Sequence, residues 1–154
     1  MSEFGFTRAS DDVLAARGRL ADDVVQSLVD AGLPAFRDDP EAAVERSGAL
    51  VSVEPDAETA SAAVSVGWRC SPDLLQAAAE RLLTGDADAP AVRYPGVIGR
   101  HMQSALIQVL LTAGIIATPE NDAMNPARVL VFGRMSDLPP ALRPTFVPPG
   151  TRSR

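Results

Sequence analysis

The chain has 154 residues, the usual length of one domain, and its 46% hydrophobic and 22% charged residues are ordinary for a globular protein in water. The net charge of −6 argues against a nucleic-acid partner, because proteins that bind phosphate backbones normally carry a basic stripe. The single cysteine cannot form an internal disulfide bond, which favours a reducing, cytoplasmic compartment.

Charge is distributed unevenly along the chain. Residues 1–60 hold thirteen acids and five arginines, whereas residues 61–154 hold seven acids and nine arginines. Lysine is absent, a bias typical of a genome rich in G and C. A polar surface of this kind usually serves solubility, and an oriented charge field that binds a partner is the less favoured alternative.

The first predicted element is a helix that begins at Ser10, after a flexible N-terminus over residues 1–9. Ser10 can cap the helix, two acids occupy its first turn, and Gly32 provides the usual stop. The sequence Asp39-Pro40-Glu41 predicts a second, short helix that ends before Ser47, with proline at its first position. The apolar residues that recur at helical spacing in the first helix are Val13, Leu14, Leu20, Val24, Val25 and Leu28.

Three strands are predicted where the apolar period shortens. Residues 49–54 and 62–69 are rich in β-branched side chains and roughly alternate between apolar and polar. Because only a short, turn-like segment links them, we expect an antiparallel hairpin. Residues 127–133 form the third predicted strand.

Two further helices are predicted between the hairpin and the last strand. Ser71-Pro72-Asp73 combines a capping hydroxyl, a proline and an acid, which predicts a helix from there to Gly85. The next helix is expected to begin around Pro95 and to end at Gly114. A loop over 118–126, a helical turn over 137–142 and a flexible, proline-rich tail over 144–154 complete the chain.

These elements predict a single α+β domain over residues 10–143, in the order α-(α)-β-β-α-α-β. We expect a small, mostly antiparallel three-stranded sheet with the helices packed on one face.

The helix over residues 97–114 lacks any charged residue after Arg100. Projected at 100° per residue, it shows one broad apolar face, a neutral polar stripe, and two apolar residues beyond that stripe, Ile107 and Leu111. The favoured explanation is a central helix covered by the rest of this chain. The second is an interface with a protein partner or a second copy, since the centres of such interfaces are depleted in charge. The third is a ligand-binding or catalytic site along the polar stripe, beginning at His101. The polar stripe consists of His101, Ser104, Gln108 and Thr112.

A membrane span is excluded for this segment by its length. The apolar run covers about thirteen residues, from Ala105 to Ala117, whereas a span needs about 20. The N-terminus also lacks the basic and apolar regions of a secretory signal.

Cys70 is the best nucleophile candidate in the chain. It lies between Arg69 and the start of the Ser71-capped helix, and both the guanidinium and the helix dipole would lower the pKa of its thiol. His101 could act as its base, and Arg69 or Arg100 could anchor an anion. The competing interpretation, a buried structural cysteine, is favoured because free cysteine is commonly buried.

No metal site and no cofactor are predicted. One histidine and one cysteine fall short of a zinc site, and no phosphate-binding or dinucleotide-binding glycine motif is present.

Two functions follow as hypotheses. The first is a non-enzymatic, cytoplasmic protein-interaction module, such as an adaptor, an inhibitor or a chaperone, that acts through helix 97–114 and self-associates. The second is a small enzyme or ligand-binding protein that uses the Cys70 thiolate with His101 and Arg69.

Overall fold

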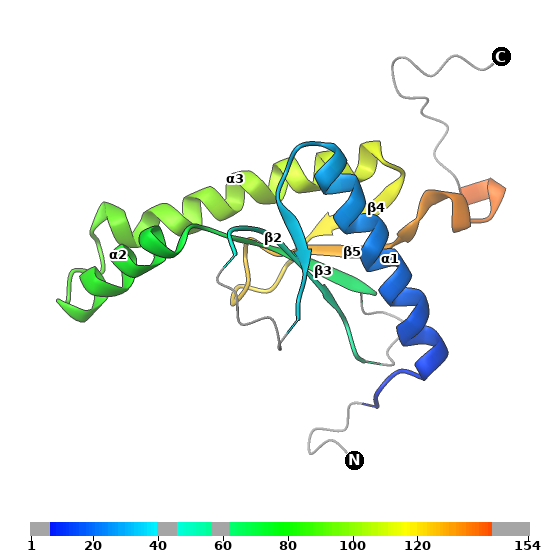
Figure 1. Cartoon of the computed structure of the whole chain (residues 1–154), viewed down its shortest axis with the longest axis horizontal. Coiled ribbons are helices and arrows are strands. Elements are labelled where there is room, and N and C mark those ends of the chain that lie inside the picture. Colours follow the sequence, from blue (N-terminus) through cyan, green and yellow to red (C-terminus); the bar gives the residue numbers. More distant parts are fainter. Residues whose placement is uncertain (1–6, 40–45, 57–61, 143–154) are drawn as a thin grey trace.

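The computed structural model describes residues 7–39, 46–56 and 62–142 (Figure 1). Within these ranges the chain forms three α-helices and one five-stranded sheet. The helices are α1 (Asp11–Asp30), α2 (Pro72–Leu83) and α3 (Pro90–Thr112). The strands are β1 (Ala35–Arg37), β2 (Gly48–Val53), β3 (Val64–Arg69), β4 (Ile115–Pro119) and β5 (Val129–Arg134), and two 3-10 turns follow at Met135–Asp137 and Pro140–Leu142.

The sheet has the strand order β1-β2-β3-β5-β4 and is mixed, because β1 pairs with β2 in parallel while the other pairs are antiparallel. The expected three-stranded, mostly antiparallel sheet is therefore wrong. The two missed strands are the edges, β1 and β4, and each begins one to three residues after a helix-ending glycine. β1 is too short to show a period, and the apolar residues of β4 follow the apolar run of α3 directly after Gly114, so they read as the end of that run.

The predicted hairpin is present as β2 and β3, which pair over their whole length with Val51 opposite Val66. Both predicted serine caps are also present. Ser10 Oγ accepts a hydrogen bond from the Val13 amide, and Ser71 Oγ accepts one from the Leu74 amide.

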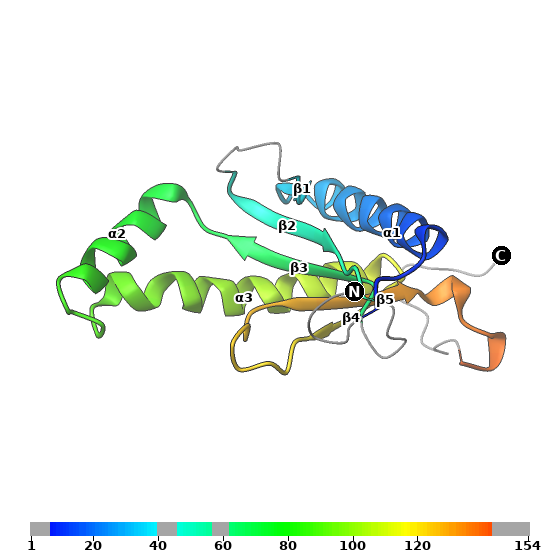
Figure 2. The same cartoon turned by 90° about the horizontal axis from the view of Figure 1, so that it is seen from below.

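The helices α1 and α3 pack against each other and against one face of the sheet (Figure 2). Each fully buried valine or leucine side chain in the shared core contributes roughly 1.5–3 kcal/mol to folding through removal of apolar surface from water. The core residues with no exposed surface are Ala21, Val24 and Leu28 from α1, Leu106 and Leu110 from α3, and Ala49, Val51, Val64, Val66, Val129 and Val131 from the sheet.

The helix α3 is longer than predicted, since it begins at Pro90 rather than near Pro95, which lies inside it. The first half of α3 projects away from the sheet together with α2, and the two helices pack as an arm (Figures 1 and 2). No residue of α2 is buried. The arm therefore depends on contacts between its two helices.

Some predictions fall outside the described residues. The short helix expected from Asp39 onward lies largely within 40–45, and the proline-rich tail and the first six residues are also outside. The expected turn over 137–142 is present in part, as the 3-10 turn Pro140–Leu142. Among the described residues, no helix is long and apolar enough to cross a membrane.

Candidate functional site

The face of α3 that points away from the core is exposed and carries no charge. We call it the outer stripe; its residues are Tyr94, Val97, His101, Ser104, Gln108 and Thr112, all exposed to solvent. Sequence reasoning found the last four, and the longer helix adds Tyr94 and Val97, which are 54% and 45% exposed. The residues recur at spacings of three or four, so they line up along the helix.

The two apolar residues next to the outer stripe are only half-buried. Ile107 packs partly against the core of its own chain, and Leu111 lies one turn further on. Arg100, the expected anion anchor, is exposed beside the stripe, and α3 contains just one other charged residue, Arg93. The chain itself thus partly covers the Ile107 side chain, whereas no described residue covers the outer stripe.

The structure separates Cys70 from His101. The Cys70 thiol is 8% exposed, and its sulfur lies 3.9 Å from the carbonyl oxygen of Pro95. His101 is six residues beyond Pro95, which is about 9 Å along a helix, and it points to solvent. No hydrogen bond joins the two side chains within the described part of the chain.

Burial raises the pKa of the Cys70 thiol above its ordinary value. The prediction that Arg69 and the helix dipole would lower this pKa is therefore wrong, because the loss of solvation disfavours the thiolate. Arg69 is half-buried and lines a cavity of about 570 Å³ with Cys70, Pro72, Leu75 and Gln76.

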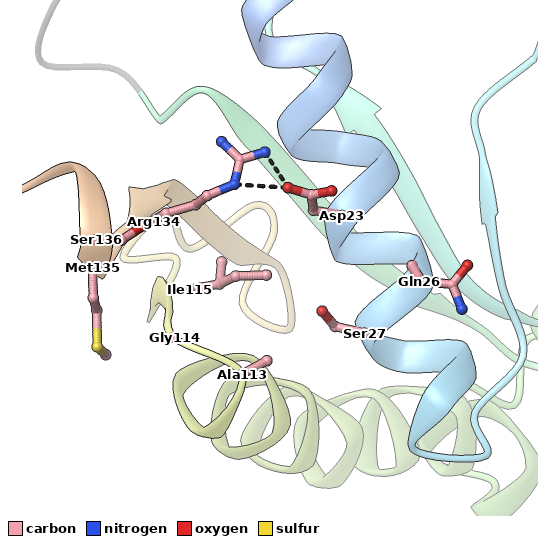
Figure 3. Close-up of a pocket in the computed structure, with 9 residues that line it drawn as sticks. All are labelled: Asp23, Gln26, Ser27, Ala113, Gly114, Ile115, Arg134, Met135 and Ser136. Atoms are coloured by element: carbon pink, nitrogen blue, oxygen red, sulfur yellow. Dashed lines mark hydrogen bonds and ion pairs between the residues drawn. The ribbon is translucent and has the colours of Figure 1, made fainter. Parts of the chain in front are cut away.

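A second cavity, of about 400 Å³, lies between α1 and the turn that joins α3 to β4 (Figure 3). On one side Arg134 donates hydrogen bonds from Nε, at 2.7 Å, and from Nη2 to the Asp23 carboxylate. Ser27 and Ile115 point toward one another across the space, with Ala113 beneath them (Figure 3). Because the two charges neutralise each other, this site ties the end of β5 to α1 rather than offering a free charge.

A third cavity, of about 320 Å³, lies on the sheet face opposite the helices. Arg128 reaches across this open face, where Nη2 donates to the Glu54 carboxylate and, at 2.7 Å, to Ser65 Oγ. Ser65 is 3% exposed. Sequence reasoning missed this cavity, because its walls come from β2, β3 and the loop before β5; the one available signal was Gly67 in the middle of a strand.

Metal binding finds no support in the described ranges, where no group of three or more His, Cys, Asp or Glu side chains is placed to hold an ion. Comparisons with protein-family models, curated proteins and solved structures give no match for this chain.

Proposed function

We propose that the chain is a non-enzymatic, cytoplasmic protein-interaction module of the adaptor, inhibitor or chaperone kind, and that it self-associates through α3. The observation that supports this most is the outer stripe. It runs along a 23-residue helix, faces solvent, and contains neither an acid nor an arginine.

The composition of the outer stripe is more typical of a surface covered by a protein partner than of one exposed to solvent. Solvent-facing helix surfaces normally carry charged side chains, and this protein has 20 acids and 14 arginines available for that purpose. The central part of a protein–protein interface is depleted in charge and enriched in aromatic residues. Tyr94 and Val97 fit the apolar part of such a surface, and His101, Ser104 and Gln108 supply groups that donate and accept hydrogen bonds.

The spacing of the outer stripe suits a second helix. The first five residues of the stripe, at positions 94, 97, 101, 104 and 108, alternate in steps of three and four, the pattern with which helices pack at a crossing angle of about 20°. A second copy is a matching partner because the stripe holds no charge that a copy of itself would repel. Two-fold contacts of this type are the commonest in homo-oligomers.

The enzymatic alternative has less support. A thiol whose pKa is raised by burial is a poor nucleophile near neutral pH, and the base expected beside it lies on another part of the helix surface.

Sedimentation velocity of the full chain at tens of micromolar tests the proposal. We expect a species of twice the 16.2 kDa chain mass, and we expect Tyr94→Glu with Val97→Glu to give a folded monomer. The control is Met124→Glu, which adds one negative charge, half of what the stripe variant adds, at a residue that is 85% exposed in the loop before β5. A wild-type monomer at this concentration, or a stripe variant that remains dimeric, would contradict self-association.

A further inference from the structure

We infer that the open face of the sheet binds a small organic anion with a flat, apolar body, such as an aromatic carboxylate, at a site centred on Gly67. This inference concerns the face opposite α1 and α3, so it goes beyond the proposed interaction through α3 and does not depend on it.

Gly67 occupies the middle of β3, opposite Leu50 of β2. Val64 and Val66 of the same strand point into the core. Because side chains alternate along a strand, Ser65, Gly67 and Arg69 lie on the open face. Glycine weakens a strand interior, because it loses more backbone entropy than other residues and has no side chain to pack.

Neither of the usual structural reasons for a strand glycine applies to Gly67. Its φ lies outside the left-handed region, and a Cβ added at this position would meet no atom within 4 Å. By contrast, a Cβ at Gly48 would lie 2.6 Å from the carbonyl oxygen of Pro34, so that glycine is required by packing. The remaining reason for a glycine in a strand is the close approach of another molecule to the backbone.

The missing side chain leaves space that is bounded on several sides. The cavity here measures about 320 Å³, at the lower end of the range for small-molecule sites. Leu50, Pro126 and Ala127 contribute apolar surface, and the loop that carries Pro126 forms a wall above the sheet. That loop is held in place because Gln103 of α3 donates hydrogen bonds to the carbonyl oxygens of Pro126 and Arg128, at 3.2 and 2.8 Å.

Arg128 brings N–H donors, rather than a free charge, to the cavity at Gly67. Arg128 lines the cavity with a side chain that is 35% exposed, and its Nη2 bonds to Glu54 and Ser65 while Nε and Nη1 bond to no described residue. Arg69, two residues further along β3, lines the neighbouring cavity of about 570 Å³ and not this one. No acid is among the residues that line the cavity, while Glu54 pairs with Arg128 and Asp38 accepts a hydrogen bond from Ser52 at 3.4 Å.

These features together define the ligand class. The unused N–H groups of Arg128 match a carboxylate or a phosphate oxygen, and Ser52 and Asn125 add polar groups at the rim. The flat backbone at Gly67 and the apolar side chains beside it match a planar hydrocarbon body. A bare inorganic ion would leave that apolar surface uncovered.

Titration of the full chain with benzoate tests this site, with the emission of Trp68 as the signal. Trp68 is the single tryptophan of the chain and lines the cavity, so the tryptophan emission comes from this one residue beside the site. We expect saturable binding with a Kd of about 1 mM, roughly tenfold weaker binding of the neutral isostere benzamide, and weaker binding of inorganic phosphate. Gly67→Val should raise the Kd for benzoate about tenfold or more while leaving the thermal midpoint unchanged or higher.

Gly18→Ala is the control, because its added Cβ also meets nothing within 4 Å but lies on α1. It should leave benzoate binding as in the wild type. Should Gly67→Val fold poorly, the smaller change Gly67→Ala, whose Cβ meets no atom within 4 Å, decides the question together with the benzamide comparison on the wild type. No saturable benzoate binding, equal affinity for benzamide, or unchanged affinity in folded Gly67→Val would each overturn the inference. Phosphate binding as strong as benzoate binding would overturn the apolar part of it.

Discussion

At the scale of single residues, Gly48 shows a backbone constraint that composition alone does not reveal. Its φ is +130°, and a Cβ there would lie 2.6 Å from Pro34 O, the same oxygen that accepts a hydrogen bond from the Ala49 amide at 2.8 Å. We expect Gly48→Ala to lower the free energy of unfolding by about 2 kcal/mol or more, since strain and clash add. Urea denaturation at fixed protein concentration measures this, and Gly18→Ala on α1 should be neutral or slightly stabilising.

Cys70 gives a second prediction at the residue scale. Because burial raises the pKa of its thiol, its reaction with iodoacetamide should be slow near neutral pH and should accelerate only at a higher pH than for a free thiol. The thiol of the unfolded chain has the lower pKa and ionises first as pH rises. The folding stability linked to this group is therefore fully present below the unfolded pKa and is lost as pH rises through the folded pKa. Cys70→Ser should reduce that alkaline loss. Alkylation as fast as that of glutathione would contradict the buried environment.

At the scale of elements, α2 is the segment least supported by the core. It has twelve residues, none buried, and helices of this length are marginal on their own. Its Ser71 cap therefore matters more than its distance from the core suggests. Ser71→Ala should destabilise α2 locally by about 1 kcal/mol and speed exchange of its amide hydrogens about fivefold. Ser10→Ala at the start of α1 is the matched control and should leave α2 exchange unchanged.

The same elements show how far sequence patterns reach. Ser10, Ser71 and the helix-ending glycines act within a few residues, so α1, α2 and the β2–β3 hairpin could be predicted. The edge strands β1 and β4 could not, because three and five residues are too few to show a period. The outer stripe of α3 was largely visible from helical spacing. The cavity at Gly67 was not, since Arg128 is 63 residues from Ser65 and only the sheet brings them together.

At the scale of the whole molecule, self-association should couple to stability. If a second copy covers the outer stripe, folding and pairing are linked, and the thermal midpoint must rise with protein concentration. We expect the wild-type midpoint to increase by a few degrees between about 2 and 200 µM. Tyr94→Glu with Val97→Glu should make the midpoint independent of concentration, whereas Met124→Glu should keep the wild-type dependence.

This measurement also separates the two surfaces of the protein. Gly67→Val alters the open face of the sheet and leaves α3 untouched, so it should retain the full concentration dependence of the midpoint while losing benzoate binding. The α3 variant should behave in the opposite way, because its substitutions lie on the arm and not in the cavity. If either variant lost both properties while remaining folded, the two faces would act as one site, and their independence would be wrong.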